Sequence, residues 1–116
     1  MSIESFTLSV TIANGASLCT LPAIANNASL VGIQMPGTWT AANLTFQGSG
    51  DGVTYQNCFD NNGVEVQVVA AAAVYIPIPP TLLPAIYALN VRSGTSGTPV
   101  NQGAARTIQL CFQAYQ

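Results

Sequence analysis

Hydrophobic and polar residues alternate one by one along much of the chain, which is the pattern of a β-strand with one buried and one exposed face. The alternation is clearest in five segments: 5–12, 42–47, 53–59, 87–92 and 107–114. Four more segments have strand-forming compositions: 16–21, 30–35, 64–69 and 72–78. Nine short strands separated by turn residues predict an antiparallel sandwich or barrel. We take an all-β sandwich of jelly-roll type, with about eight to nine strands, as the expected fold.

Helices have little room in this pattern, because seven prolines and ten glycines divide the chain into short runs. Only the segment 80–85 is expected to form a helical turn, and its flanking prolines limit it to about one turn. The sequence contains no repeat and no linker-like change in composition. A length of 116 residues suits one domain, so residues 1–116 are expected to fold as a single β-sandwich domain.

Charged residues are scarce, and this changes what the surface can be. The chain has four acidic residues, two arginines, no lysine and no histidine, so that 5% of its residues are charged against about 25% in an ordinary soluble domain. The exposed strand faces must therefore consist of serine, threonine, asparagine, glutamine and glycine. Such a surface repels its neighbours weakly and suits a protein that works packed against others.

The same inventory excludes several classes of function. Without histidine or lysine the chain cannot form a Ser-His, Cys-His or Ser-Lys pair or a Schiff base, and we expect no enzyme activity and no cofactor. Two arginines give no electrostatic footprint for nucleic acid and no polybasic membrane site. The longest apolar run, 68–78, is too short to span a bilayer, and no basic and apolar leader opens the chain, so we expect synthesis in the cytoplasm.

The three cysteines are Cys19, Cys58 and Cys111. Their odd number and wide spacing predict neither a disulfide framework nor a zinc site. The strand pattern places Cys58 and Cys111 on the polar faces of their strands. Each is therefore a candidate contact with a neighbouring subunit, and the alternative is a small side chain that fills space under a loop.

Two turns stand out. Asp51 and Gly52 lie between two alternating runs, where the aspartate can accept backbone hydrogen bonds while the glycine adopts a positive φ. Asp60 and Gly63 frame a second turn of the same kind. Asp51 could instead be a calcium ligand, but the sequence supplies no second acid close to it.

Trp39 and the two arginines each have two interpretations. Trp39 lies between strands, where it either seals one end of the core or serves as a platform for a sugar ring. Arg92 and Arg106 are expected to pair with acids, either within the chain or across a subunit interface, because an unpaired buried arginine is costly. A clamp for a carboxylate or phosphate ligand is the remaining alternative.

Two longer stretches carry a resemblance. Residues 30–55 (LVGIQMPGTWTAANLTFQGSGDGVTY) and 87–110 (YALNVRSGTSGTPVNQGAARTIQL) together cover about half the chain. In order and spacing they resemble small β-sandwich structural proteins of tailed bacteriophages.

The resemblance implies a virion component, most like a capsid decoration (cement) protein. It also implies a homo-oligomer, with a trimer as the expected state, that contacts the major capsid protein or other virion proteins. A head-to-tail or tail accessory protein is one alternative, and a carbohydrate-binding module that uses Trp39 is another. No catalytic residue transfers from these structural proteins.

Overall fold

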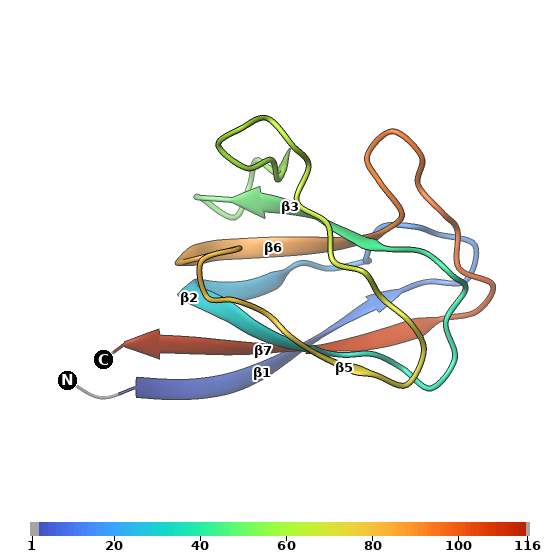
Figure 1. The fold of residues 1–116 in the computed structure, drawn as a ribbon, viewed down its shortest axis with the longest axis horizontal. Coiled ribbons are helices and arrows are strands. Elements are labelled where there is room, and N and C mark those ends of the chain that lie inside the picture. The colour runs from blue at the N-terminus through green and yellow to red at the C-terminus, as the bar shows by residue number, and fades with distance from the viewer. Residues whose placement is uncertain (1–2, 116) are drawn as a thin grey trace.

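Every regular element of the structure, a computed structural model that describes residues 3–115, is a β-strand (Figure 1). Seven antiparallel strands form one open sheet, and none of the described residues lies in a helix. The order across the sheet is β1-β7-β2-β6-β3-β4, and β5 pairs with β2. The bounds of the strands are β1 (Ile3–Ile12), β2 (Ala23–Gln34), β3 (Leu44–Ser49), β4 (Gln56–Asn57), β5 (Tyr75–Pro77), β6 (Ile86–Ser93) and β7 (Arg106–Tyr115).

The longest ladder joins β1 to β7, and it runs without interruption from Ile3 opposite Tyr115 to Ile12 opposite Arg106. Apolar residues of both strands point to one face, on which Val10 and Ile12 are buried and the Phe6 ring stacks on Phe112 at 5.6 Å between centroids. The strict alternation of these strands therefore separates a core face from a polar face.

Strand β2 connects the two halves of the sheet because it changes partner along its length. Its last residues, from Ser29 on, pair with β7, whereas Ala23–Ala28 pair with β6. The register shifts between Ile24 and Ala28, where Asn26 and Asn27 have φ angles of 53° and 69°. Asparagine tolerates this left-handed region better than most residues, so these two residues suit the irregularity.

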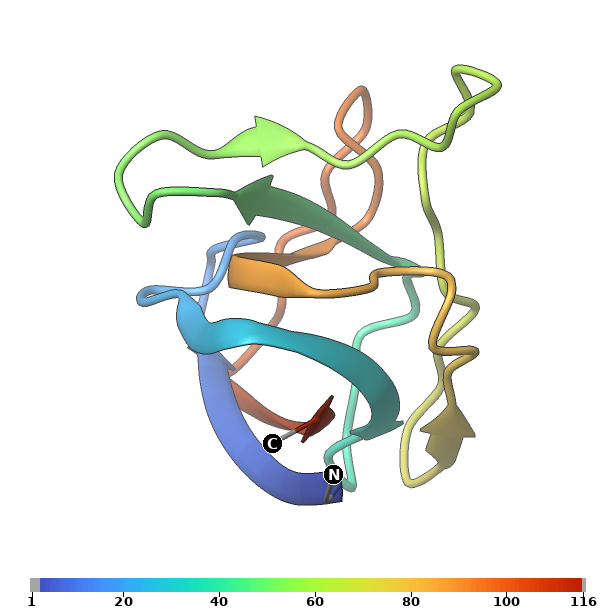
Figure 2. The ribbon, with the colours of Figure 1, turned by 90° about the vertical axis from the view of Figure 1, so that its left-hand side faces the viewer.

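The core is completed by residues outside the long strands. Val66 and Val68 precede β5, and Ile78 and Leu83 follow it, and all four belong to the same buried cluster as the strand residues. Figure 2 shows the chain between β4 and β6 running along one side of the sheet. This connection therefore covers apolar surface that the sheet would otherwise expose.

Several expectations from the sequence are wrong in detail. The segments 16–21 and 64–69 form isolated bridges, such as Cys19 with Ile12 and Val68 with Leu44, and not strands. The segment 72–78 contains only the three residues of β5, whereas the expected strand at 30–35 is the end of the longer β2. The expected all-β antiparallel fold is confirmed, with seven strands in place of eight to nine, and they form one open hydrogen-bonded sheet because β2 pairs with both halves.

Two further corrections concern local geometry. The expected helical turn at 80–85 is a turn in which the Leu82 N–H donates to the Pro79 carbonyl, and nearby prolines lack the N–H groups that a helix needs. The alternation expected over 53–59 fails because the strand there consists of Gln56–Asn57 only. As a result Cys58 packs against the core while Phe59, expected inside, is 52% exposed.

Candidate interaction surface and the groove beside it

The outer side of β1 and β7 is a continuous uncharged surface, which we call the polar face. It carries hydroxyl, amide and thiol side chains on both strands: Ser5, Thr7, Ser9 and Thr11 on β1, and Thr107, Gln109, Cys111 and Gln113 on β7. The charged residues of these strands, Glu4 and Arg106, have the opposite parity and belong to the other side. The two strands therefore offer ten residues of length with no formal charge.

Cross-strand contacts fix the side chains of the polar face. The Ser9 hydroxyl donates to Gln109 Oε1 at 2.9 Å, the Thr11 and Thr107 hydroxyls lie 3.0 Å apart, and Thr7 Oγ1 lies 3.9 Å from Cys111 Sγ. These pairs hold rotamers that would otherwise be free. The face is consequently ordered before any partner binds, which lowers the entropy cost of binding.

Tyr75 of β5 borders this face. Its ring lies directly over Gly32 of β2, at the place a side chain would occupy, and Gly32 is opposite Cys111. A hydrogen bond with the Cys111 thiol raises the pKa of the Tyr75 phenol. Tyr75 is 54% exposed, so it adds a neutral aromatic group to the edge of the surface. The sequence analysis did not identify Tyr75. The glycine at position 32, which leaves room for an aromatic ring, was the signal that could have indicated it.

Arg92 lies inside the molecule. Its guanidinium approaches Glu65 at 3.5 Å, and the two side chains are 9% and 11% exposed. It also donates to Thr45 Oγ1 at 3.3 Å and to Asn57 Oδ1 at 2.6 Å. Of the three alternatives for Arg92, an ion pair within the chain, a subunit contact and a ligand clamp, the structure shows the ion pair, and its burial leaves little of the side chain for a neighbour.

The Glu65 carboxylate ties a distant loop to the same cluster. Both of its oxygens lie 3.2 Å from the Ser96 N–H, which belongs to the loop between β6 and β7. Thr45 in turn donates to the Gly94 carbonyl at 2.6 Å. The buried ion pair and its hydrogen bonds therefore hold the β4–β5 and β6–β7 connections against β3 and β6.

Arg106 has neutral partners only. It donates from Nε to Gln102 Oε1 at 3.2 Å, and from its two other nitrogens to Thr38 at 2.9 Å and Thr40 at 3.4 Å. Within residues 3–115 no carboxylate pairs with it. Gln102 is buried and also binds the backbone of Thr40 and the hydroxyl of Ser93, so Arg106 extends a network that closes one end of the sheet.

Asp51 and Asp60 both sit in turns. Asp51 Oδ1 accepts hydrogen bonds from the N–H groups of Val53 and Thr54 and from the Ser49 hydroxyl, all at 2.9 Å. These bonds lower the pKa of the Asp51 carboxyl. Asp60 Oδ1 accepts from two backbone N–H groups, and Gly52 and Gly63 have φ angles of 76° and 79°.

Trp39 is half-buried and packs against the core. Its indole N–H donates to the Ala42 carbonyl at 3.0 Å. The ring therefore contributes to closing the core, and its polar atom has a partner in its own loop. This position favours the structural interpretation of Trp39 over the sugar platform.

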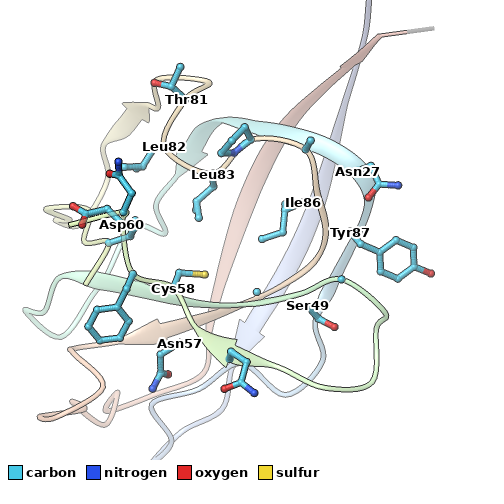
Figure 3. A pocket seen from close by; sticks show the side chains of 18 residues that line it. Asn27, Ser49, Asn57, Cys58, Asp60, Thr81, Leu82, Leu83, Ile86 and Tyr87 are labelled. Carbon is cyan, nitrogen blue, oxygen red and sulfur yellow. The ribbon is translucent and has the colours of Figure 1, made fainter. Parts of the chain in front are cut away.

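A groove of about 630 Å³ lies between the segment 56–61 and the segment 81–87. In Figure 3 the side chains of Cys58, Leu83 and Ile86 lie in its middle, with Asp60 on one side and Asn27 on the other. Burial raises the pKa of the Cys58 thiol, so the thiol is protonated at neutral pH. The groove combines an apolar floor with a rim of amides.

All three cysteines are free thiols in the structure. Among the described residues, no three acidic or cysteine side chains come together as metal ligands would. A search of residues 3–115 finds no helix that is long and apolar enough to cross a membrane.

No family model matches the sequence, and no curated protein matches it.

Proposed function

We propose that the protein is a structural component of a tailed-phage virion, and that it decorates and stabilises the capsid through its polar face. The observation that carries this proposal is the uncharged and ordered surface along β1 and β7. Contacts through such a surface depend on shape and hydrogen bonds, so they lose little when salt screens charges. The resemblance of residues 30–55 and 87–110 supplies the virion context.

The proposal includes the homo-oligomer, with the major capsid protein or another virion protein as the partner. It also includes the jelly-roll type of architecture, in which the two halves of the sheet on either side of the irregularity in β2 would correspond to the two layers. The proposed site of action is the assembled particle, after synthesis in the host cytoplasm. No enzymatic step is proposed.

The direct test compares particles with and without the protein. We expect complete particles to withstand heat and osmotic shock better, and equal survival would remove the stabilising role. Copy number by quantitative mass spectrometry separates the alternatives, because a decoration protein is expected in hundreds of copies. A small fixed number would instead support a head-to-tail or tail accessory protein.

A surface variant tests the role of the polar face itself. The double variant Ser9→Lys/Gln109→Lys places two charges in its centre, and we expect it to fold but to lose attachment to the particle. The matched control Asn61→Lys/Asn101→Lys adds the same charge at exposed loop positions and should attach normally. Attachment of both variants would exclude the polar face as the contact.

Carbohydrate binding is the second candidate, and the groove is the observation that favours it. Its rim of amide groups with Asp60 suits the neutral hydroxyls of a sugar. A glycan array with the wild type, Asn27→Ala and Trp39→Ala tests it. A specific signal lost in Asn27→Ala would place the sugar in the groove, loss in Trp39→Ala alone would favour the tryptophan, and no signal would remove the candidate.

A further inference from the structure

Strand β1 has one unpaired edge. Its other edge is paired with β7 along its whole length. At the end of the strand the chain itself occupies the free edge, because Thr20 donates to the Thr11 carbonyl at 2.9 Å and Cys19 bridges to Ile12. From Ile3 to Val10 no other described segment pairs with β1.

The Thr11 bond also shows which backbone groups face outward. Backbone N–H and C=O groups alternate between the two sides of a strand, and the Thr11 carbonyl points away from β7. Ser5, Thr7 and Ser9 have the same parity, so their backbone groups point to the free edge, as do those of Ile3. The side-chain contact of Thr11 with Thr107 at 3.0 Å agrees, because directly opposed side chains are closest in pairs without ladder hydrogen bonds.

Most of this edge, from residue 5 onward, lacks the features by which sheet proteins commonly prevent pairing. Natural edges carry lysines, prolines, bulges or inward-pointing charges that prevent pairing with another chain. Glu4 is the one such charge in the described strand, because it has the same parity as Phe6 and Leu8; residues 5–12 contain none of these features, and the ladder with β7 is regular. The inner side chains Phe6 and Leu8 are only half-buried, whereas Val10 and Ile12 at the other end are buried. An added strand beside β1 would lie next to Phe6 and Leu8 and would bury more of their surface.

We propose that β1 of one copy pairs antiparallel with β1 of a second copy, which forms a two-fold dimer with a continuous sheet. A strand that pairs with itself about a residue keeps parity, so polar faces meet polar faces and apolar faces meet apolar faces. The register with Phe6 on the axis engages all four outward residues: Ser5 faces Thr7 of the second copy, and Ile3 faces Ser9. Phe6 then faces its own equivalent, and aromatic cross-strand pairs are favourable.

Charge permits this contact. Glu4 is the one charged residue in β1, and in this register it faces Leu8 and not the second Glu4. The dimer joins two polar faces into one surface of double width. It also excludes a trimer built through this edge, because an isologous contact closes after two copies.

The first test measures the mass of the purified full chain by sedimentation at several concentrations. We expect a dimer for the wild type and a monomer for Thr7→Pro, because the Thr7 N–H belongs to the free edge and its loss breaks no bond to β7. Asn61→Pro is the matched control. Asn61 is the second residue of an exposed turn closed by the Gly63 N–H and the Asp60 carbonyl, where proline is favoured, so this variant should remain a dimer.

Amide hydrogen exchange of the wild type keeps the test valid even if Thr7→Pro fails to fold. In the dimer we expect the amides of Ser5, Thr7 and Ser9 to exchange about tenfold or more slower at high than at low protein concentration. The amides of Phe6 and Leu8, which bond to β7, should be protected at both. A monomer at all concentrations, or an oligomer whose Ser5, Thr7 and Ser9 amides exchange freely, would overturn the proposal.

This inference does not depend on the virion role. Dimers that fail to attach to particles would leave it standing and remove the proposed function. Monomers that still stabilise particles would remove the dimer and leave the stabilising role standing.

Discussion

Replacing Arg92 tests how the buried ion pair stabilises the fold. The change Arg92→Met keeps most of the side-chain volume and removes the guanidinium. Its loss leaves Asn57 Oδ1 and the Glu65 carboxylate without their strongest donor, while Glu65 retains only the Ser96 N–H among its hydrogen-bond donors. A carboxylate that is 11% exposed and uncompensated is costly to keep in the folded state.

Removing one partner of a buried pair typically costs about 3–5 kcal/mol, and we expect the loss in unfolding free energy for Arg92→Met to fall in that range. Small domains have about 5–15 kcal/mol in total, so the variant should still fold but lose a large share of its stability. Glu65→Gln keeps the size of the side chain and one oxygen that can accept from the Ser96 N–H, and Arg92 keeps Thr45 and Asn57 as acceptors. The expected cost of Glu65→Gln is therefore smaller, about 1–3 kcal/mol.

Urea unfolding followed by the fluorescence of Trp39, the single tryptophan, measures these losses. The double variant Arg92→Met/Glu65→Gln should lose less than the sum of the single variants Arg92→Met and Glu65→Gln by about 1–3 kcal/mol, because no uncompensated charge remains. Arg106→Met is the control. Arg106 has only neutral partners, so its loss should cost about 1 kcal/mol. A cost below about 1 kcal/mol for Arg92→Met would refute the argument.

Three further predictions follow from the loops and from β2. Gly94→Ala should lose about 1–3 kcal/mol in thermal unfolding, because Gly94 has a φ of 87° and an added carbon would lie 2.6 Å from the Thr98 carbonyl oxygen; an unchanged melting temperature would contradict this. Asp51→Asn should be less stable than the wild type at pH 7. Because folding lowers the Asp51 pKa, the difference is complete above its ordinary value of 3.8 and is lost as the pH falls through the folded value, so a constant gap down to pH 2 would count against it. Gly32→Ala should displace the Tyr75 ring and bring its phenol pKa down toward 10, and an unchanged ultraviolet titration would show that the ring does not depend on the glycine.

The strands that could be predicted from the sequence have different environments on their two faces. Over residues 5–12 of β1 and 107–114 of β7 the aliphatic and aromatic residues face the core and the hydroxyls and amides face outward, so the alternation is strict there. The first half of β2 was missed because its run of alanines and asparagines gives little contrast. The segment 64–69 alternates because Val66 and Val68 are buried, but it lacks a partner strand and forms only bridges.

The site residues show the same division between local and tertiary information. The hydrogen bonds of Asp51 and Asp60 join residues at most four positions apart, so the sequence contains all that is needed to anticipate them. The sequence offered Asp51, Asp60 and Glu65 as possible partners of Arg92, and the tertiary structure places Glu65 beside it, together with the loop at Ser96. Cys58 was assigned to the wrong face because the parity count began at Val53, which belongs to the turn of Asp51.

The positions of the charges explain how the polar face of β1 and β7 can be uncharged without loss of stability. Arg92 and Glu65 fasten two loops inside the molecule, Arg106 extends the network that closes one end, and Asp51 and Asp60 shape turns. None of them is needed on the polar face or on the free edge of β1 from residue 5 onward. Both surfaces therefore carry neutral hydrogen-bonding groups and no formal charge. Association through either surface should depend weakly on salt, because salt screens charges. Weakening of attachment or of the dimer by 1 M salt would indicate a contact made elsewhere on the molecule.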